Sequence, residues 1–138
     1  MKKLILLLLC TATLGLASCK KDTIIQEPLS KTIIFDITPN QWILSNDGLT
    51  YSAEYNKIPE IDNFGLNVEG TLVYISYPNY TSYQQLPFVY DVDAFSYSAY
   101  VGGIAIDIQS SDFQQATPRK PTQTIRVKVV IVPSKDIS

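Results

Sequence analysis

The chain has 138 residues and a formal net charge of −2 at pH 7, with 11 lysines and arginines against 13 aspartates and glutamates. This length fits one domain, and the balance of charge without clustered basic residues excludes a nucleic-acid-binding surface. The chain contains no histidine and only two cysteines, which excludes Ser-His-Asp and Cys-His catalysis and most types of zinc site.

The first 18 residues have the pattern of an export signal. Lys2 and Lys3 precede an apolar run from Leu4 to Leu9, and small residues follow, which is the order found in a cleaved signal peptide. The alternative, a transmembrane helix, needs about 20 apolar residues, and this run is shorter and is interrupted by Cys10 and two threonines. We therefore expect residues 1–18 to be removed.

Leu16-Ala17-Ser18-Cys19 resembles the lipobox of bacterial lipoproteins. The resemblance implies that the Cys19 thiol is acylated, with palmitate among the attached chains, and that lipid holds the protein in the outer membrane of the cell envelope, on its periplasmic or its outer surface. Several acyl chains together anchor a protein stably. With Cys10 removed and Cys19 acylated, the remaining chain has no disulfide, so its stability must come from its core.

Residues 19–31 mix charged residues with Pro28 and show no sustained period, which predicts a lipidated tether. Within it, Asp22-Thr23-Ile24 resembles the Asp-Ser/Thr-apolar O-glycosylation motif of Bacteroidetes-type proteins, and an unmodified spacer is the alternative. From Thr32 onward apolar and polar residues alternate with a period of two, which is typical of half-buried strands. Strands are predicted at 32–37, 42–44, 49–55, 70–77, 84–90, 95–101, 104–110 and 124–132.

Individual residues predict the turns between these strands and the position of two strands in the sheets. Asn46-Asp47-Gly48 supplies the turn of a hairpin, and residues 58–69 are predicted to form a connection with at most a short strand or one helical turn. Both faces of Leu72–Ile75 are apolar, which predicts a central strand covered on both sides. Pro87 cannot donate a backbone hydrogen bond, so its strand should lie at an edge or contain a bulge.

Gly102-Gly103 predicts a tight hairpin between 95–101 and 104–110. A two-residue loop there places Val101 opposite Ile104, Ala99 opposite Ile106 and Tyr97 opposite Ile108, all facing the core. Asp107 would then face solvent. In the last strand the residues that face the core are Ile125, Val127, Val129 and Ile131.

These elements predict an all-β domain over residues 32–138, an antiparallel two-sheet sandwich of about seven strands that is immunoglobulin-like in outline, with a small barrel as the alternative. Over roughly residues 66–133, the segments Gly70–Tyr74, Tyr83–Phe88 and Ile125–Pro133 are similar to small Bacteroidetes-type lipoproteins of unassigned function. The resemblance implies no catalytic residue.

Two acids and three tyrosines are the candidate site residues. Asp91 and Asp93 lie two apart, so on an extended segment both carboxylates project from one side and can hold a cation. The alternative is a solvated loop, because calcium takes about six to eight oxygen ligands. Tyr77, Tyr80 and Tyr83 recur every three residues in a loop, and such rings suit contacts with glycans or protein partners. Their alternative role is to close the open end of the core.

The sequence therefore predicts a lipid-anchored, non-catalytic binding module with no cofactor, no metal and no nucleic-acid partner. Its expected partners are the membrane, through the lipid on Cys19, and a glycan or an outer-membrane protein. The alternative function is that of a structural subunit in a surface assembly, whose strand edges join neighbouring copies.

Overall fold

The computed structural model describes residues 27–112 and 117–138. The predicted signal peptide, the lipobox with Cys19 and most of the tether lie outside the described residues. Within them, no helix has the length and apolar character needed to cross a membrane.

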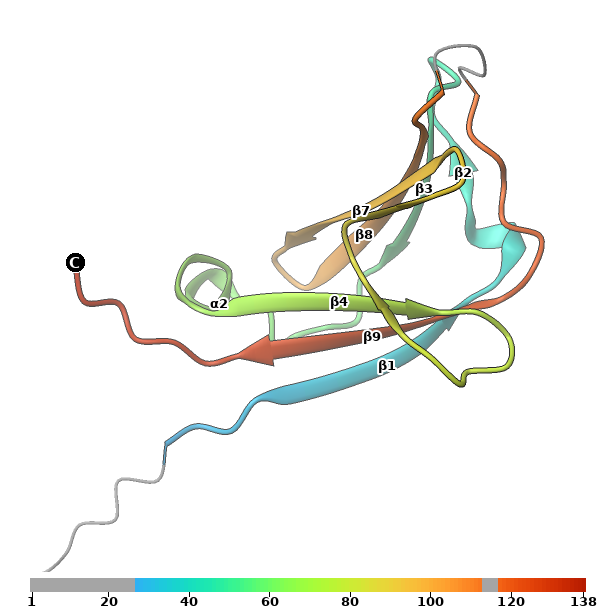
Figure 1. Ribbon diagram of the computed structural model, residues 1–138. Coiled ribbons are helices and arrows are strands. Elements are labelled where there is room, and N and C mark those ends of the chain that lie inside the picture. Colours follow the sequence, from blue (N-terminus) through green and yellow to red (C-terminus); the bar gives the residue numbers. More distant parts are fainter. Residues whose placement is uncertain (1–26, 113–116) are drawn as a thin grey trace, which may run out of the picture.

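The described chain forms two antiparallel sheets around one core (Figure 1). The four-stranded sheet has the order β1 (Lys31–Ile37), β9 (Ile125–Val132), β4 (Gly70–Ser76) and β5 (Gln84–Gln85). The five-stranded sheet has the order β2 (Ile43–Leu44), β3 (Thr50–Tyr55), β8 (Gly103–Ser110), β7 (Asp93–Tyr100) and β6 (Phe88–Tyr90). This confirms the predicted all-β sandwich, and the alternative barrel is wrong because the sheets do not close.

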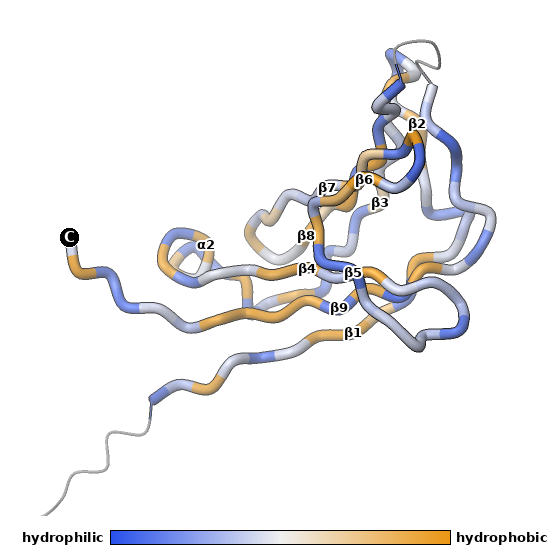
Figure 2. The backbone as a smooth tube through the Cα atoms, in the orientation of Figure 1, coloured by the Kyte–Doolittle hydropathy of each residue, from blue (hydrophilic) through white to orange (hydrophobic). Residues whose placement is uncertain are grey.

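Alternation along the strands builds the core. Apolar residues follow β1, β4 and β9 in Figure 2, and their inward positions are almost fully buried. On β9 the predicted inward residues are all at most 3% exposed: Ile125, Val127, Val129 and Ile131. Ile104, Ile106 and Ile108 on β8 face them from the other sheet and are equally buried. Each such side chain contributes about 1.5–3 kcal/mol by leaving water.

A single short helix, α2 (Asn63–Val68), interrupts the connection between β3 and β4. Its N-cap is Asp62, whose carboxylate accepts a hydrogen bond of 2.7 Å from the Gly65 N–H. Before the helix, Ile58 and Ile61 are buried. Residues 58–69 are thus a connection, as predicted, and of the two alternatives expected within it, a short strand or one helical turn, the structure has a helix, whose six residues exceed one turn.

The β7–β8 hairpin exists, but its predicted register is wrong by two residues. Tyr100 pairs with Gly103 and Ala99 with Ile104, so the loop consists of Val101 and Gly102. Gly102 takes the turn position because its φ is +85°, whereas Gly103 belongs to β8, where a Cβ would lie 2.4 Å from the Tyr55 carbonyl oxygen. A shift of two preserves the faces, although Val101 is 52% exposed rather than buried.

The predicted strand at 84–90 is two strands in different sheets. β5 is an edge of the four-stranded sheet and β6 an edge of the five-stranded sheet, and the chain crosses between them at Leu86-Pro87. This confirms the edge position predicted from Pro87. β4 is central as expected, but its outer face is not fully covered, because Leu72 and Tyr74 are only half-buried while Val73 and Ile75 are buried.

The strand pairing defines two ends of the sandwich. Lys31 pairs with Ile131 and Gly70 with Val132 at one end, which we call the tether end because the predicted tether leads into β1 there. Ser76 pairs with Arg126 at the other, distal end. Figure 1 shows the loop after β4 at the opposite end of that sheet from the C-terminus. A seven-residue strand separates the two ends by about 20 Å.

Candidate functional site

The loop of residues 77–83 joins β4 to β5 at the distal end and carries the three predicted tyrosines. Tyr80 has a φ of +47°, a left-handed conformation that is unfavourable for a side chain of this size. A hydrogen bond of 2.9 Å from its N–H to the Tyr77 carbonyl closes the turn. The turn directs Tyr77 toward one surface and Tyr80 and Tyr83 toward another, so the three rings do not share one platform.

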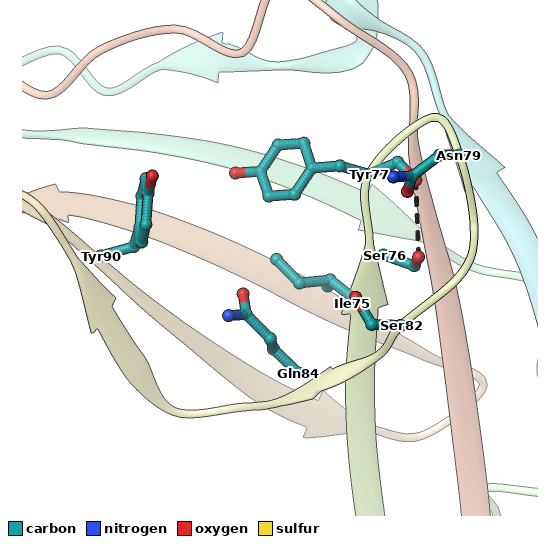
Figure 3. Close-up of a pocket in the computed structure, with 7 residues that line it drawn as sticks. All are labelled: Ile75, Ser76, Tyr77, Asn79, Ser82, Gln84 and Tyr90. Atoms are coloured by element: carbon teal, nitrogen blue, oxygen red, sulfur yellow. Dashed lines mark hydrogen bonds between the residues drawn. The ribbon is translucent and has the colours of Figure 1, made fainter.

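Tyr77 forms one wall of an open cleft of about 370 Å³. Figure 3 shows its ring pointing from the loop toward Tyr90 on β6, with the Gln84 side chain below the two rings in this view. Ser82 and Asn79 complete the rim. Tyr77 is 39% exposed and Tyr90 is 65% exposed, so neither ring is buried in the core. The cleft therefore presents two solvent-exposed aromatic rings together with amide and hydroxyl groups.

The predicted carboxylate pair lies beside this cleft and already faces a cation. Asp91, at a φ of +53° in the β6–β7 turn, and Asp93, the first residue of β7, both contact Arg119. Arg119 Nη1 lies 3.0 Å from Asp91 Oδ2, and Arg119 Nη2 lies 2.7 Å from Asp93 Oδ2. The guanidinium of the chain itself thus occupies the position between the carboxylates where the sequence allows a cation, with a solvated loop as the alternative. Within the described residues, no group of three or more acids and cysteines is placed to hold a metal ion.

Tyr77 separates the cleft from a second hollow of about 320 Å³, whose lining includes Asp93, Arg119 and Gln123. Burial of the ring raises the pKa of the Tyr77 hydroxyl, and the negative charge of Asp93 raises it further, against an opposing effect of Arg119. The hydroxyl therefore stays protonated at neutral pH and can donate a hydrogen bond to a ligand.

The other two tyrosines lie on the outer face of the four-stranded sheet, over basic residues of β9. The Arg126 guanidinium lies 3.8 Å from the centroid of the Tyr80 ring. The Lys128 ammonium lies 4.3 Å from the centroid of Tyr83 and 4.5 Å from that of Tyr74. These distances are typical of cation–π contacts. Both Tyr80 and Tyr83 are half-buried in these contacts.

The cleft is suited to noncovalent recognition. Its polar lining residues are two serines, two tyrosines, an asparagine and a glutamine, which donate and accept hydrogen bonds but are neutral at pH 7. Sequence reasoning missed Tyr90 and Gln84, because their place depends on the crossing of the chain between sheets. It also missed the contact of Arg119 with Asp91 and Asp93, because Arg119 lies in a distant, proline-containing loop and no sequence pattern links that loop to the two aspartates.

Comparisons of the chain with protein families, with curated proteins and with solved structures give no match.

Proposed function

We propose that this protein is a lipid-anchored binding module of the cell envelope, and that the cleft between Tyr77 and Tyr90 receives an uncharged glycan. The observation that carries the proposal is the lining of the cleft, which combines two exposed rings with a glutamine amide. Sugar rings have flat C–H faces that pack on aromatic rings, and hydroxyl groups that pair with amides and phenols. A neutral lining suits a neutral ligand, because it leaves no charge to be desolvated.

The position of the cleft supports a role at a membrane surface. It lies at the distal end of the sandwich, whereas the predicted tether enters at the opposite end, at Lys31. Lipid on Cys19 would therefore hold the tether end toward the membrane and leave the cleft facing away from it. A ligand outside the membrane would meet the cleft without obstruction by the bilayer.

The cleft is tested with a glycan array that includes mucin-type O-glycans, followed by calorimetry on a bound neutral glycan. Tyr90→Ala should weaken binding at least about tenfold without lowering the melting temperature, because an exposed ring leaves no cavity when it is removed. Val89→Ala is the matched control, since Val89 is also exposed on β6 but projects to the opposite face from Tyr90. Absence of glycan binding, or equal affinity of wild type and Tyr90→Ala, would overturn the proposal.

The anchor is tested separately. Cys19→Ser removes the sulfur that the lipobox resemblance predicts to be acylated, so the variant should be unacylated and should leave the membrane fraction. A variant that still sediments with membranes and keeps residues 1–18 would contradict the lipobox. A wild-type protein with an unmodified Cys19 thiol by mass spectrometry would contradict the anchor.

One observation favours the second candidate, a structural subunit. Among the described residues, β1 pairs along one side only, with β9, and such a long open edge can accept a strand from another copy. Sedimentation of residues 27–138 at micromolar concentration distinguishes the two functions. A structural subunit should form large species, whereas a binding module should remain a monomer.

A further inference from the structure

Arg126 and Lys128 form a matched pair of cations on the outer face of the four-stranded sheet. They lie two residues apart on β9, so both side chains project to the same side. Tyrosines of the loop 77–83 cover both of them, Tyr80 at Arg126 and Tyr83 at Lys128. The two positions are thus built from the same parts.

They differ in what lies opposite them on β1. Asp36 pairs with Arg126 in the strand register, and its carboxylate accepts hydrogen bonds of 2.8 Å and 3.1 Å from the guanidinium. The residue that pairs with Lys128 is Ile34, which is 55% exposed. Within the described residues, Lys128 forms no ion pair with an acid. Arg126 therefore has one ring and a carboxylate, whereas Lys128, among the residues described, has two rings and no carboxylate.

The Lys128 ammonium contacts two aromatic rings, but these contacts do not satisfy its hydrogen-bond donors. The ammonium of Lys128 carries three N–H donors, and an aromatic face attracts the charge without replacing an oxygen acceptor. Contacts with Tyr74 and Tyr83 also hold the side chain in place, so less conformational entropy is lost when a ligand binds. The position is preorganised for an anionic group that approaches from the side of Ile34.

We propose that this face binds an acidic saccharide, a chain of uronic-acid residues, at Lys128. A carboxylate of the sugar accepts a charge-assisted hydrogen bond from the Lys128 ammonium, just as the Asp36 carboxylate accepts hydrogen bonds from the Arg126 guanidinium. The apolar face of the same sugar ring lies against the exposed side chain of Ile34. Because the sheet face is open at β1, its edge strand, a polymer can continue past the site. This site is separate from the cleft at Tyr90 and does not depend on the neutral glycan proposed there.

The test compares one polymer in two charge states. Oligogalacturonate is titrated into residues 27–138 by calorimetry, and the same oligomer with its carboxylates methyl-esterified serves as the neutral probe. The acid form should bind at least about tenfold more tightly than the ester, which is the size expected for a hydrogen bond between charged groups. Added salt should weaken binding of the acid form, because the contact is exposed.

Two variants locate the site. Lys128→Gln removes the charge, and Ile34→Asp places a carboxylate of the chain itself opposite Lys128, as Asp36 lies opposite Arg126. Both should reduce affinity for oligogalacturonate at least about tenfold. Ile34→Asp keeps every cation and tyrosine of the face, so its loss of binding cannot be ascribed to a lost cation or a lost cation–π contact. Lys57→Gln, which removes an exposed cation elsewhere, should bind like wild type.

Several outcomes would overturn the proposal. These are no binding of oligogalacturonate by the wild type, equal affinity for the esterified oligomer, and wild-type affinity in both Lys128→Gln and Ile34→Asp. Equal binding of a poly-glutamate peptide or of vesicles rich in anionic lipid would show a general attraction to negative charge instead. The Tyr90→Ala variant should retain full affinity for oligogalacturonate, so failure of the cleft proposal and failure of this one give different results.

Discussion

Arg119 and Asp93, 26 residues apart in the chain, are joined by a hydrogen bond of 2.8 Å from the guanidinium Nε to Asp93 Oδ2. The Asp93 side chain is only 11% exposed, so Arg119 supplies the positive charge and the donors that a nearly buried carboxylate needs. The hydrogen bond that Arg119 donates to Asp93 also raises the pKa of Arg119, with smaller contributions from Asp91. The pair ties the loop after residue 117 to the start of β7, beside the wall that Tyr77 forms.

The first prediction is that Arg119→Ala lowers the melting temperature by several degrees, because Asp93 is left charged without its partner. Lys120→Ala, the exposed neighbour, should change it little. The double variant Arg119→Ala with Asp93→Asn should be more stable than the sum of the single effects, because the neutral amide costs less to bury. If the stability losses of the two single variants add up to the loss of the double variant, Arg119 and Asp93 do not interact and the prediction is wrong.

The second prediction concerns the faces of β8. Ile106 is 1% exposed in the core, so Ile106→Asp buries a carboxylate among apolar residues and should cost about 3 kcal/mol or more. Asp107 projects to the other face, where it accepts a hydrogen bond from Ser52, and Asp107→Ile should be far milder. Trp42, the only tryptophan, is buried, so its fluorescence reports unfolding of both variants. Equal denaturation midpoints would mean that the faces are wrongly assigned.

The sequence allows the faces of the strands to be predicted because burial on one side selects every second residue. On that basis the inward residues of β9 are correctly placed in the core: Ile125, Val127, Val129 and Ile131. The register of the β7–β8 hairpin was wrong because two adjacent glycines do not reveal their separate roles. Gly102 is needed for its φ, and Gly103 for the approach of the Tyr55 carbonyl oxygen.

The candidate site was less predictable than the core. The alternation of apolar and polar residues shows which side of a strand faces solvent, but it does not show which strands are neighbours. Lys128 contacts Tyr74 and Tyr83 because β9 pairs with β4, and this pairing could not be predicted from the sequence. Similarly, the sequence shows that Asp91 and Asp93 lie two residues apart and can act together. Their partner Arg119 comes from a distant loop, and no local period of the sequence links the two segments.

The third prediction separates the two glycines of the hairpin. Gly102→Ala meets open space but forces alanine to a φ of +85°, which should cost about 1 kcal/mol. Gly103→Ala places a Cβ 2.4 Å from a backbone oxygen, so strands must move apart and the loss should be larger. Gly48→Ala, with a φ of +74° in open space, is the control and should resemble Gly102→Ala. Urea unfolding of the three variants measures these costs, and a Gly103→Ala variant as stable as the other two would contradict the close approach to Tyr55.

The last prediction concerns acid stability and the pair of Asp36 and Arg126. The hydrogen bonds from Arg126 lower the pKa of Asp36 below its ordinary value of 3.8, against a smaller effect of desolvation. The folded protein therefore binds a proton at Asp36 less readily than the unfolded chain does. The stability that the pair contributes is fully present above about pH 5, where Asp36 is ionised in both states, and is lost as the pH falls through the ordinary value and then the lowered pKa.

Asp36→Asn removes this contribution. At pH 7 the variant should melt a few degrees below wild type at most, because both side chains are a third or more exposed, at 33% and 40%, and exposed pairs are weak. The difference should shrink as the pH is lowered from about 5 to about 2, since protonation abolishes the pair in the wild type as well. Glu54→Gln, which removes an exposed acid on β3, is the control for the change of net charge. A difference between wild type and Asp36→Asn that grows on acidification would contradict the lowered pKa of Asp36.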